Sequence, residues 1–239
     1  DIDLTCCFIA GNVQKYLYPY EPVILQMSEL CRVLVNVNID SEDDTGMEIK
    51  KLPVKIIERS WGSSVGAGNA WLRKQKQVVV DSATTQFVLY LDIDEMLHEQ
   101  SFDYIRYIVT RKLFGFSSMA FSYYHFYGDL KHVIPDNAGD AWSTKIVRLM
   151  RQPAKFREDF DGYGFASHPM EVTYCWGHRI FHYSHVRPRE VWHEKNAMMY
   201  ARYGKNYDRL AIDYGKLERF SVAHPAIIGK YLQLFEVGS

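Results

Sequence analysis

The chain of 239 residues is 47% hydrophobic and 24% charged, and it is long enough for one large domain or two small ones. Its formal net charge of -1 excludes a general electrostatic attraction to nucleic acid or to an anionic membrane. Because no run of 18 apolar residues occurs and the four cysteines include no Cys-x-x-Cys pair, we expect no transmembrane segment, zinc site or disulfide framework, but a soluble cytoplasmic protein with reduced thiols.

Strands and helices alternate over the first 80 residues. Apolar runs predict buried strands at residues 4–10, 33–39 and 54–57. Apolar residues spaced by three and four predict helices at residues 20–31 and 69–79. Strands that alternate with helices form parallel sheets with right-handed crossovers, so the order of these elements predicts an α/β fold.

An acidic cluster, DSEDDT at residues 40–45, follows the second of these strands. A calcium loop is the obvious competing interpretation, but Asp43 stands where an EF-hand needs glycine. Neighbouring parallel strands bring their carboxyl ends to one edge of a sheet. We therefore expect Asp40 and Asp43 to face the same crevice as Asp92, which ends the central strand.

That central strand lies in FVLYLDIDEMLHE, at residues 87–99. Residues 87–91 have the bulk and branching of a strand buried on both faces, and the carboxyl end of such a strand is where open α/β sheets bind ligands. Side chains two apart on a strand share a face, so Asp92 and Asp94 can both point at one hard cation. An acidic turn without function is the simpler interpretation of an isolated Asp-x-Asp, but the buried strand and the motifs elsewhere favour a site.

The remaining residues predict further strands and helices. Helical spacing covers residues 102–113, and an aromatic-rich strand is expected over residues 116–127. Such aromatic residues are more typical of packing than of a sugar-stacking surface, which would have the same composition. The polar stretch 129–142 has the length of a lid or binding loop. Strands are also expected at 144–150, near 171–174 and at 180–186, and helices at 190–203 and from His224 to about Leu234.

Several motifs, in their order along the chain, resemble those of the family 2 type of GT-A glycosyltransferase. CFIAGNVQKYL, with Asn12, is similar to that family's first strand and turn, and NIDSEDDT is similar to its nucleotide-binding acidic turn, with Asn38 where the family usually has aspartate. GAGNAWL, with Asn69, resembles the start of the next helix, and YLDIDE resembles the metal-binding Asp-x-Asp. VRLMR, SHPMEV and IFHYSHVR resemble acceptor-side elements, so the resemblance covers about residues 4–196.

This resemblance implies a single GT-A-like, Rossmann-like domain over residues 1–239, with a mostly parallel central sheet flanked by helices. Residues 1–99 would bind the nucleotide sugar, and residues 100–239 would bind the acceptor and supply the C-terminal helices. The implied activity is metal-dependent, inverting transfer of a sugar from a nucleotide-diphosphate sugar, with a UDP-sugar favoured. The acceptor would be a hydroxyl of a glycan, lipid or protein, and no nucleic acid is expected as a partner.

The resemblance also assigns the metal and the donor contacts. Asp94 would bind a Mn²⁺ or Mg²⁺ ion directly, Asp92 would bind it through water or hold the ribose, and His182 would be a third ligand. A nitrogen ligand beside carboxylates favours manganese. A histidine packed in the core is the alternative for His182. The donor-binding residues implied are Asn12, Asp40, Asp43, Asn69 and Asp92.

An inverting transfer needs a general base for the acceptor hydroxyl. The likeness of SHPMEV to the family's His-Glu element makes Glu171 the first choice as catalytic base. Asp159 and Asp161, in REDFDGYG, are the alternatives. Candidates for diphosphate contact, with an exposed surface role as the alternative for each, are Arg148, Arg187 and Lys195.

Two other functions remain open at this point. A sugar-1-phosphate nucleotidyltransferase would share the sheet and the metal, but it should have a Gly-rich, Arg-containing phosphate loop after the first strand, where this chain reads AGNVQKYL. A module that binds glycan or nucleotide without catalysis would use the same crevice. Hydrolysis of a nucleotide sugar without acceptor would separate the enzyme from such a module.

Overall fold

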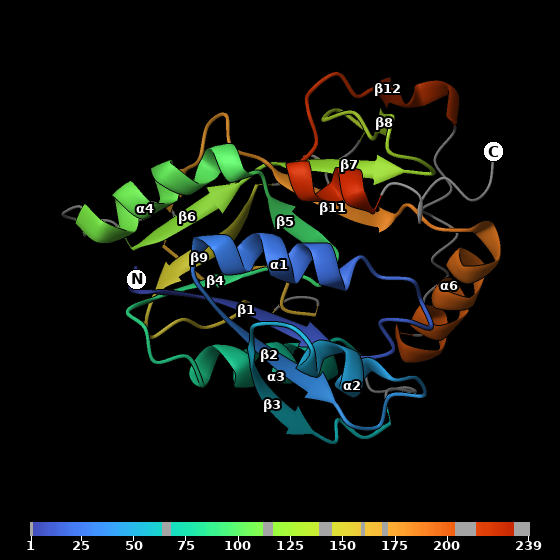
Figure 1. Ribbon diagram of the computed structural model, residues 1–239, viewed down its shortest axis with the longest axis horizontal. Coiled ribbons are helices and arrows are strands. Elements are labelled where there is room, and N and C mark those ends of the chain that lie inside the picture. The colour runs from blue at the N-terminus through green and yellow to red at the C-terminus, as the bar shows by residue number, and fades with distance from the viewer. Residues whose placement is uncertain are drawn as a thin grey trace.

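Seven strands form the central sheet of the computed structural model, which describes residues 2–63, 68–111, 117–138, 145–158, 161–168, 172–203 and 214–231. The strands lie in the order β10-β6-β9-β4-β1-β2-β3 (Figure 1). The pairs β1–β2, β1–β4, β2–β3 and β6–β10 are parallel, whereas β9 runs antiparallel to both β4 and β6. The expected mostly parallel sheet is therefore confirmed. Its strands are β1 (Leu4–Ala10), β2 (Arg32–Asn38), β3 (Lys55–Arg59), β4 (Phe87–Tyr90), β6 (Ser118–Phe121), β9 (Ile146–Arg151) and β10 (Val172–Tyr174).

Helices cover both faces of this sheet. The side chains of β1 alternate between two apolar clusters, one on each face. Cys6 and Phe8 pack in the cluster that includes the buried face of α1 (Tyr20–Leu30). Cys7 and Ile9 pack in the cluster that includes residues of α3 (Gly68–Asp81). All seven residues of β1 are buried, as expected for a strand covered on both faces. The other helices described are α2 (Thr45–Lys50), α4 (Phe102–Arg111) and α6 (Arg189–Tyr203).

A second sheet, with the strand order β12-β8-β7-β11-β5, lies above the first in Figure 1. The single strand expected over residues 116–127 is wrong, because the chain changes sheets at Ser122: β6 belongs to the central sheet and β7 to the second. The carbonyl of Ser122 accepts a hydrogen bond from the backbone N–H of Ile180, which draws the chain toward β11. The strands are β5 (Glu95–Leu97), β7 (Tyr123–Tyr127), β8 (His132–Val133), β11 (Ile180–His185) and β12 (Glu218–Arg219).

Two other expectations need correction. The polar stretch 129–142 is not all loop, since residues 132 and 133 form β8. In place of an apolar α-helix from His224, the structure has a short 3₁₀ helix, η5 (Ala226–Lys230), and residues 232–234 lie outside the described part of the chain. The other short 3₁₀ helices are η1 (Glu99–Ser101) and η4 (Tyr214–Lys216). No helix in the described ranges combines the length and apolar character needed to cross a membrane.

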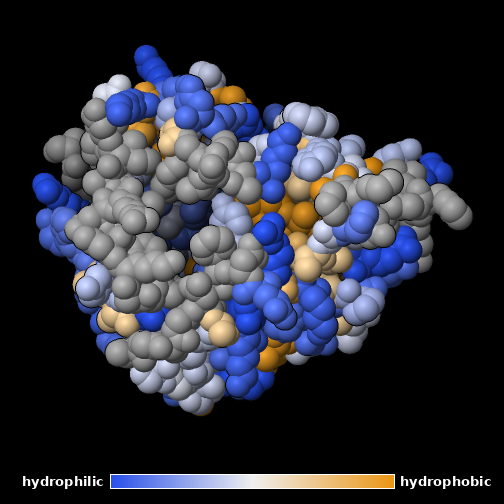
Figure 2. All heavy atoms as spheres, turned by 180° about the vertical axis from the view of Figure 1, so that it is seen from behind, coloured by the Kyte–Doolittle hydropathy of each residue, from blue (hydrophilic) through white to orange (hydrophobic). Residues whose placement is uncertain are grey.

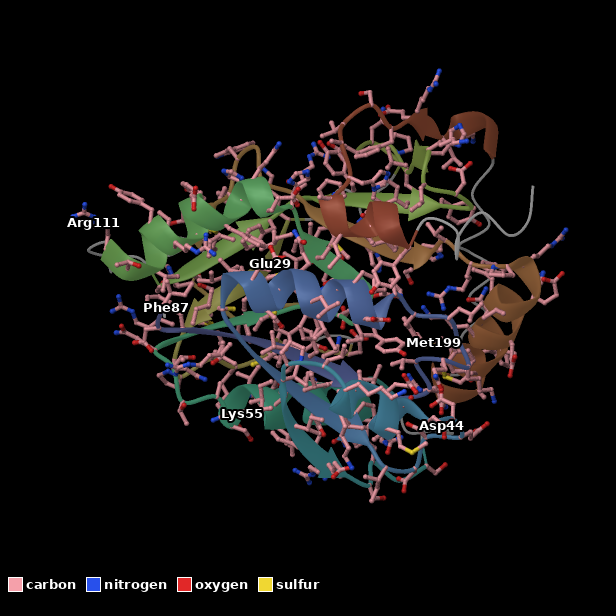
Figure 3. The ribbon with its side chains drawn as sticks, in the orientation of Figure 1. Glu29, Asp44, Lys55, Phe87, Arg111 and Met199 are labelled. Atoms are coloured by element: carbon pink, nitrogen blue, oxygen red, sulfur yellow. The ribbon has the colours of Figure 1, made fainter. Side chains whose placement is uncertain are left out.

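The carboxyl ends of β1, β2 and β4 point toward α6. In Figure 3, Phe87 marks the amino end of β4 at the left, whereas Asp44, in the loop after β2, and Met199, on α6, lie at the right. The chain leaves β4 at Asp92, enters the second sheet at β5, and pairs there with β11, so that Glu95 lies opposite His182. Acids that end the central strand thus stand at the junction of the two sheets.

Candidate functional site

A cavity of about 770 Å³ opens at this junction. Seen from behind, the molecule is hollowed on the side that carries α6 (Figure 2). Both halves of the chain line the cavity, and among the lining residues are most of the acids and cations considered above. From the first half these include Asn12, Asp40, Lys76, Asp92 and Asp94, and from the second half His125, Arg148, Asp161, His182 and Lys195.

Asn12 holds the loop after β1 against the loop after β2. Its φ of 52° lies in the left-handed region, which asparagine tolerates better than most residues. The Asn12 Oδ1 accepts a hydrogen bond from the backbone N–H of Glu42 at 2.7 Å, and the Asn12 N–H donates to Ser41 Oγ at 3.2 Å. The side chain therefore shapes the cavity wall that it lines.

Asp43 has a different place from the other candidates. Its Oδ2 accepts hydrogen bonds from the backbone N–H groups of Gln14 at 2.9 Å and Lys15 at 2.8 Å, and its Oδ1 accepts one from the N–H of Thr45 at 3.0 Å. Asp43 is not among the residues that line the cavity. The structure thus uses this carboxylate to fasten the loop after β1, and it does not bring it together with Asp92.

Asp40 lines the cavity and organises the segment after β3. Its Oδ2 accepts hydrogen bonds from Ser60 Oγ at 2.7 Å and from the N–H groups of Trp61 and Gly62 at 3.0 Å. These donors, the Ser60 hydroxyl first, lower the pKa of Asp40. The Trp61 ring forms part of the cavity wall and meets Trp71 edge to face, with ring centroids 5.6 Å apart. The candidate Asn69 begins α3, but its side chain lies outside the described residues.

Asp92 is bound by three neighbours. Its Oδ1 accepts a hydrogen bond from the Tyr90 hydroxyl at 3.0 Å and lies 3.4 Å from Lys76 Nζ, and its Oδ2 accepts one from an NH2 group of Arg148 at 3.1 Å. The side chain is 34% exposed to the cavity but deep enough for burial to raise its pKa. The charges of Lys76 and Arg148 outweigh burial and hold the pKa of Asp92 below its usual range.

Asp94 is almost entirely buried, with 5% of its side chain exposed. Its Oδ1 lies 3.7 Å from His182 Nε2, and its Oδ2 lies 3.7 Å from Lys195 Nζ and 3.8 Å from Arg187 NH2. Its backbone carbonyl accepts a hydrogen bond from the N–H of Tyr183 on β11 at 2.9 Å. Asp94 and His182 are therefore brought together, whereas Asp92 faces the cations Lys76 and Arg148.

Four cations surround these acids, and all of their side chains are mostly or fully buried. Burial and the nearby positive charge of Arg187 lower the pKa of Lys195 to about 7. Among the residues described, NH1 of Arg148, which lines the cavity, has no hydrogen-bond partner. A buried donor of this kind favours an acceptor-rich anion in the cavity. The four cations are Lys76, Arg148, Arg187 and Lys195.

Two side chains, and not three, are placed to bind a divalent ion. Across the described ranges, no three His, Cys, Asp or Glu side chains converge closely enough to hold a metal. The 3.7 Å between Asp94 Oδ1 and His182 Nε2 is less than twice a metal–ligand distance of about 2.1 Å, so one ion can contact both atoms. A carboxylate oxygen and an imidazole nitrogen suit manganese. These two residues fit a metal ion whose other ligands come from a bound molecule or water.

His182 is in turn held by a second histidine. Its Nδ1 lies 2.8 Å from Nδ1 of His125, its partner in register on β7, so one nitrogen donates and the other accepts. The ring of Tyr123 stacks on His125, with centroids 5.0 Å apart, and the Tyr123 hydroxyl accepts a hydrogen bond from Arg148 Nε at 2.6 Å. These contacts leave Nε2 of His182 directed toward Asp94.

The candidates for the base are only partly described. Glu171 and Asp159 lie outside the described residues. Asp161 lines the cavity, and its Oδ2 lies 3.5 Å from Lys76 Nζ. Burial lowers the pKa of Lys76, but Asp161 and Asp92 more than compensate, so that its pKa is raised.

Sequence reasoning missed Lys76, although α3 carries a signal for it. Leu72 precedes Lys76 by four residues, and Val79 and Val80 follow it by three and four, which puts the lysine on the apolar stripe of the helix. A charge on a buried stripe needs a partner. Glu95 and His125 carry no comparable signal, because their partners Arg148 and His182 are more than fifty residues away in the chain.

Replacing Arg148 by methionine should destabilise the protein by about 3 to 5 kcal/mol, because a buried charge loses its partner. The guanidinium is 2% exposed, and it donates to Glu95 Oε1 at 2.8 Å as well as to Asp92. Urea denaturation would measure the loss. The matched control is Lys155→Met, since Lys155 is 61% exposed and pairs with Asp81 on the surface, where less than about 0.5 kcal/mol is expected. Equal stabilities of the two variants would show that Arg148 does not hold the acids in place.

Comparison with known proteins finds no matching family model and no matching curated protein. The chain is similar to the crystal structure of S. aureus TarS 1-349, with 13% identity and a TM-score of 0.48 over 82% of this chain and 65% of that one. It is also similar to TarS 1-349 in complex with UDP-GlcNAc, with 11% identity and a TM-score of 0.49 over 83% of this chain and 66% of that one. The chain is also similar to glucosyl-3-phosphoglycerate synthase from Mycobacterium tuberculosis in complex with Mn²⁺, UDP-glucose and phosphoglyceric acid. The identity is 16% and the TM-score is 0.38, over 52% of this chain and 44% of that one.

The chain thus spans just under two thirds of the length of the TarS 1-349 structures that it matches. Identities this low and TM-scores below 0.5 leave the function to be derived from the cavity itself.

Proposed function

We propose that this chain is a glycosyltransferase that moves a sugar from a nucleotide-diphosphate sugar to an acceptor hydroxyl. One observation carries the proposal: at the carboxyl ends of the central strands, a single cavity combines the acids Asp92 and Asp94 with buried lysine and arginine side chains within 4 Å of them. Carboxylates suit a metal ion and sugar hydroxyls, and buried cations suit a diphosphate. A nucleotide sugar carries all of these groups in one molecule.

The dimensions of the cavity support a donor of this kind. Its volume of about 770 Å³ is within the range of about 300 to 1,000 Å³ that small-molecule sites occupy. Trp61 lines the cavity beside Asp40 and would lie next to the nucleobase, and Lys76, Arg148 and Lys195 line the cavity as well. The acidic turn at residues 40–45 resembles a nucleotide-binding turn, and we favour a UDP-sugar as the donor.

A Mn²⁺ or Mg²⁺ ion would be held by Asp94 and His182. When bound, it would neutralise negative charge on the departing diphosphate. Lys195 and Arg187 would add positive charge next to Asp94. Asp92, whose side chain is 34% exposed, would contact the ribose or the sugar. Electrostatic stabilisation of this kind acts most strongly where side chains exclude water, as they do around Asp94.

Inverting transfer would need a base on the acceptor side of the cavity. Glu171 is our first candidate from its motif, and Asp161 is the alternative that lines the cavity. Asp161 Oδ2 lies 3.5 Å from Lys76 Nζ, so this carboxylate already has a partner within the chain. Glu171 therefore stays our first candidate on its motif.

Binding of UDP is expected to be tighter with manganese than without it, and GDP and dTDP are expected to bind less well. Titration calorimetry with each nucleotide, with and without Mn²⁺, measures both effects. A panel of UDP-sugars, scored for slow nucleotide release without acceptor, then tests for catalysis. Release of pyrophosphate from UTP and a sugar 1-phosphate would instead identify a nucleotidyltransferase, and binding without any release would identify a binding module. If no nucleotide binds with manganese present, the proposal is wrong.

A further inference from the structure

A second cavity, of about 260 Å³, lies where the chain passes from the central sheet to the second sheet. Ser122, at which the change of sheet occurs, forms part of its wall. The cavity is lined mainly by residues that the donor site does not use. Among them are Asp136, Lys145, Cys175, Trp176 and Arg179.

The rim of this cavity carries two exposed aromatic rings. Trp176, in the turn after β10, is 75% exposed, and Tyr174, at the end of the strand, is 45% exposed. Their ring centroids lie 6.3 Å apart. Lys145 Nζ lies 3.7 Å from the centroid of the Trp176 ring and 5.0 Å from that of Tyr174, so the lysine packs over one face of the indole and leaves most of the Trp176 surface exposed. A large aromatic surface held in this way is available to a ligand.

The opposite wall of this cavity is polar and rigid. Arg179 donates two hydrogen bonds to Asp136, at 2.8 and 2.7 Å, and a third to the carbonyl of Tyr123 at 3.1 Å. Its guanidinium also lies over the ring of Tyr124, 4.7 Å from the centroid. The planar ion pair therefore keeps a fixed orientation, with 62% of the Asp136 side chain exposed. Carboxylate oxygens held like this accept hydrogen bonds from neighbouring hydroxyl groups.

The two cavities share Tyr123. The hydroxyl of this residue binds Arg148 in the donor site, whereas its backbone carbonyl binds Arg179 in the second cavity. The same adjacency occurs at the start of β9, because Lys145, the residue before the strand, lines the second cavity and Ile146 lines the first. The two spaces are therefore separated by only one residue at each of these points.

We propose that the second cavity is a saccharide-binding subsite, which holds one sugar unit of a glycan acceptor beside the transfer site. A pyranose has an apolar face of C–H groups that packs on an indole, and hydroxyls at its edge that bind a planar ion pair. Trp176 and the Asp136–Arg179 pair supply these two surfaces. The acceptor role rests on the proposed function, whereas saccharide binding does not. Among glycan, lipid and protein acceptors, the subsite selects a glycan.

Binding of oligosaccharides to the full chain tests the inference. The probes are cellohexaose, maltohexaose, chitohexaose and a hyaluronan hexasaccharide, each measured by calorimetry without nucleotide. We expect at least one to bind, Trp176→Ala to weaken it about tenfold, and Trp176→Phe to restore most of the affinity. The matched control is Tyr107→Ala, which removes a ring of 53% exposure on α4 that does not line the cavity.

The outcomes separate this inference from the proposed function. If none of the four hexasaccharides binds, or if Trp176→Ala binds as well as the parent, the subsite is wrong even when UDP binding is intact. Saccharide binding that depends on Trp176 in a protein that binds no UDP would support the subsite and overturn the transferase. Tighter binding of the hyaluronan hexasaccharide, lost in Lys145→Gln, would assign an acidic sugar to the subsite, and equal binding of chitohexaose would assign a neutral one.

Discussion

Asp94→Asn is expected to remove the effect of manganese on UDP affinity and to lower the rate of sugar transfer at least about 100-fold. The substitution keeps the size of the side chain but takes away the charged oxygen that faces His182 Nε2 at 3.7 Å. Loss of one group that stabilises developing charge typically costs about 10² to 10³ in rate. Calorimetry with and without manganese measures the first effect, and turnover measures the second.

Asp94→Asn should also lower the melting temperature. An acid at an open sheet edge would contribute little to stability, but Asp94 is buried beside Lys195 and Arg187, which the substitution leaves without a counter-charge. Asp81→Asn is the matched control, because Asp81 is an exposed acid whose partner Lys155 is itself in water. A variant of Asp94 with the manganese dependence of the parent protein would exclude this residue as a metal ligand.

Glu171→Gln is expected to lower the transfer rate by about 10² to 10⁴, with the affinity for the donor unchanged. Glutamine keeps the shape of the side chain and removes its basicity, and a base for the acceptor takes no part in donor binding. Asp159→Asn and Asp161→Asn are the comparison variants, and both should lower the transfer rate less than Glu171→Gln does. Steady-state rates measured with donor and acceptor varied separately give the transfer rate and the donor affinity.

The comparison among the three acids decides the base. If Asp161→Asn is inactive while Glu171→Gln turns over almost normally, the base is Asp161, which already lines the cavity beside Lys76. The transferase itself would survive that result. Full activity in all three variants would leave the reaction without a protein base and would favour a binding module.

The sequence predicts the central sheet well, because its strands follow local patterns. The apolar runs at residues 4–10 and 87–91 correspond to β1 and β4, and the acids after β4 lie at the sheet edge where open α/β sheets bind ligands. Where a helix connects two buried parallel strands, the connection is almost always right-handed, so few sheet topologies are possible. The place of Asp92 and Asp94 beside one cavity follows from this.

The second sheet could not be predicted in the same way. Residues 118–127 are aromatic and apolar on both sides of Ser122, so no change in polarity marks the point where the chain leaves one sheet for the other. The burial of Arg148 is hidden for a related reason. Its partners Asp92 and Glu95 are more than fifty residues away, and only the fold brings them together.

The junction between the sheets gives the site two separately anchored parts. The carbonyl of Asp94 accepts a hydrogen bond from Tyr183, and His182 lies opposite Glu95 in the antiparallel pair β5–β11. The two residues of the proposed metal site are therefore both held by this one strand pair. The part of the cavity wall around Asp40 and Trp61, where we propose that the nucleobase binds, depends on β2 and β3 at the far side of the central sheet. A small rotation of one sheet against the other would therefore change the distance from Asp40 and Trp61 to Asp94 and leave the distance between Asp94 and His182 unchanged.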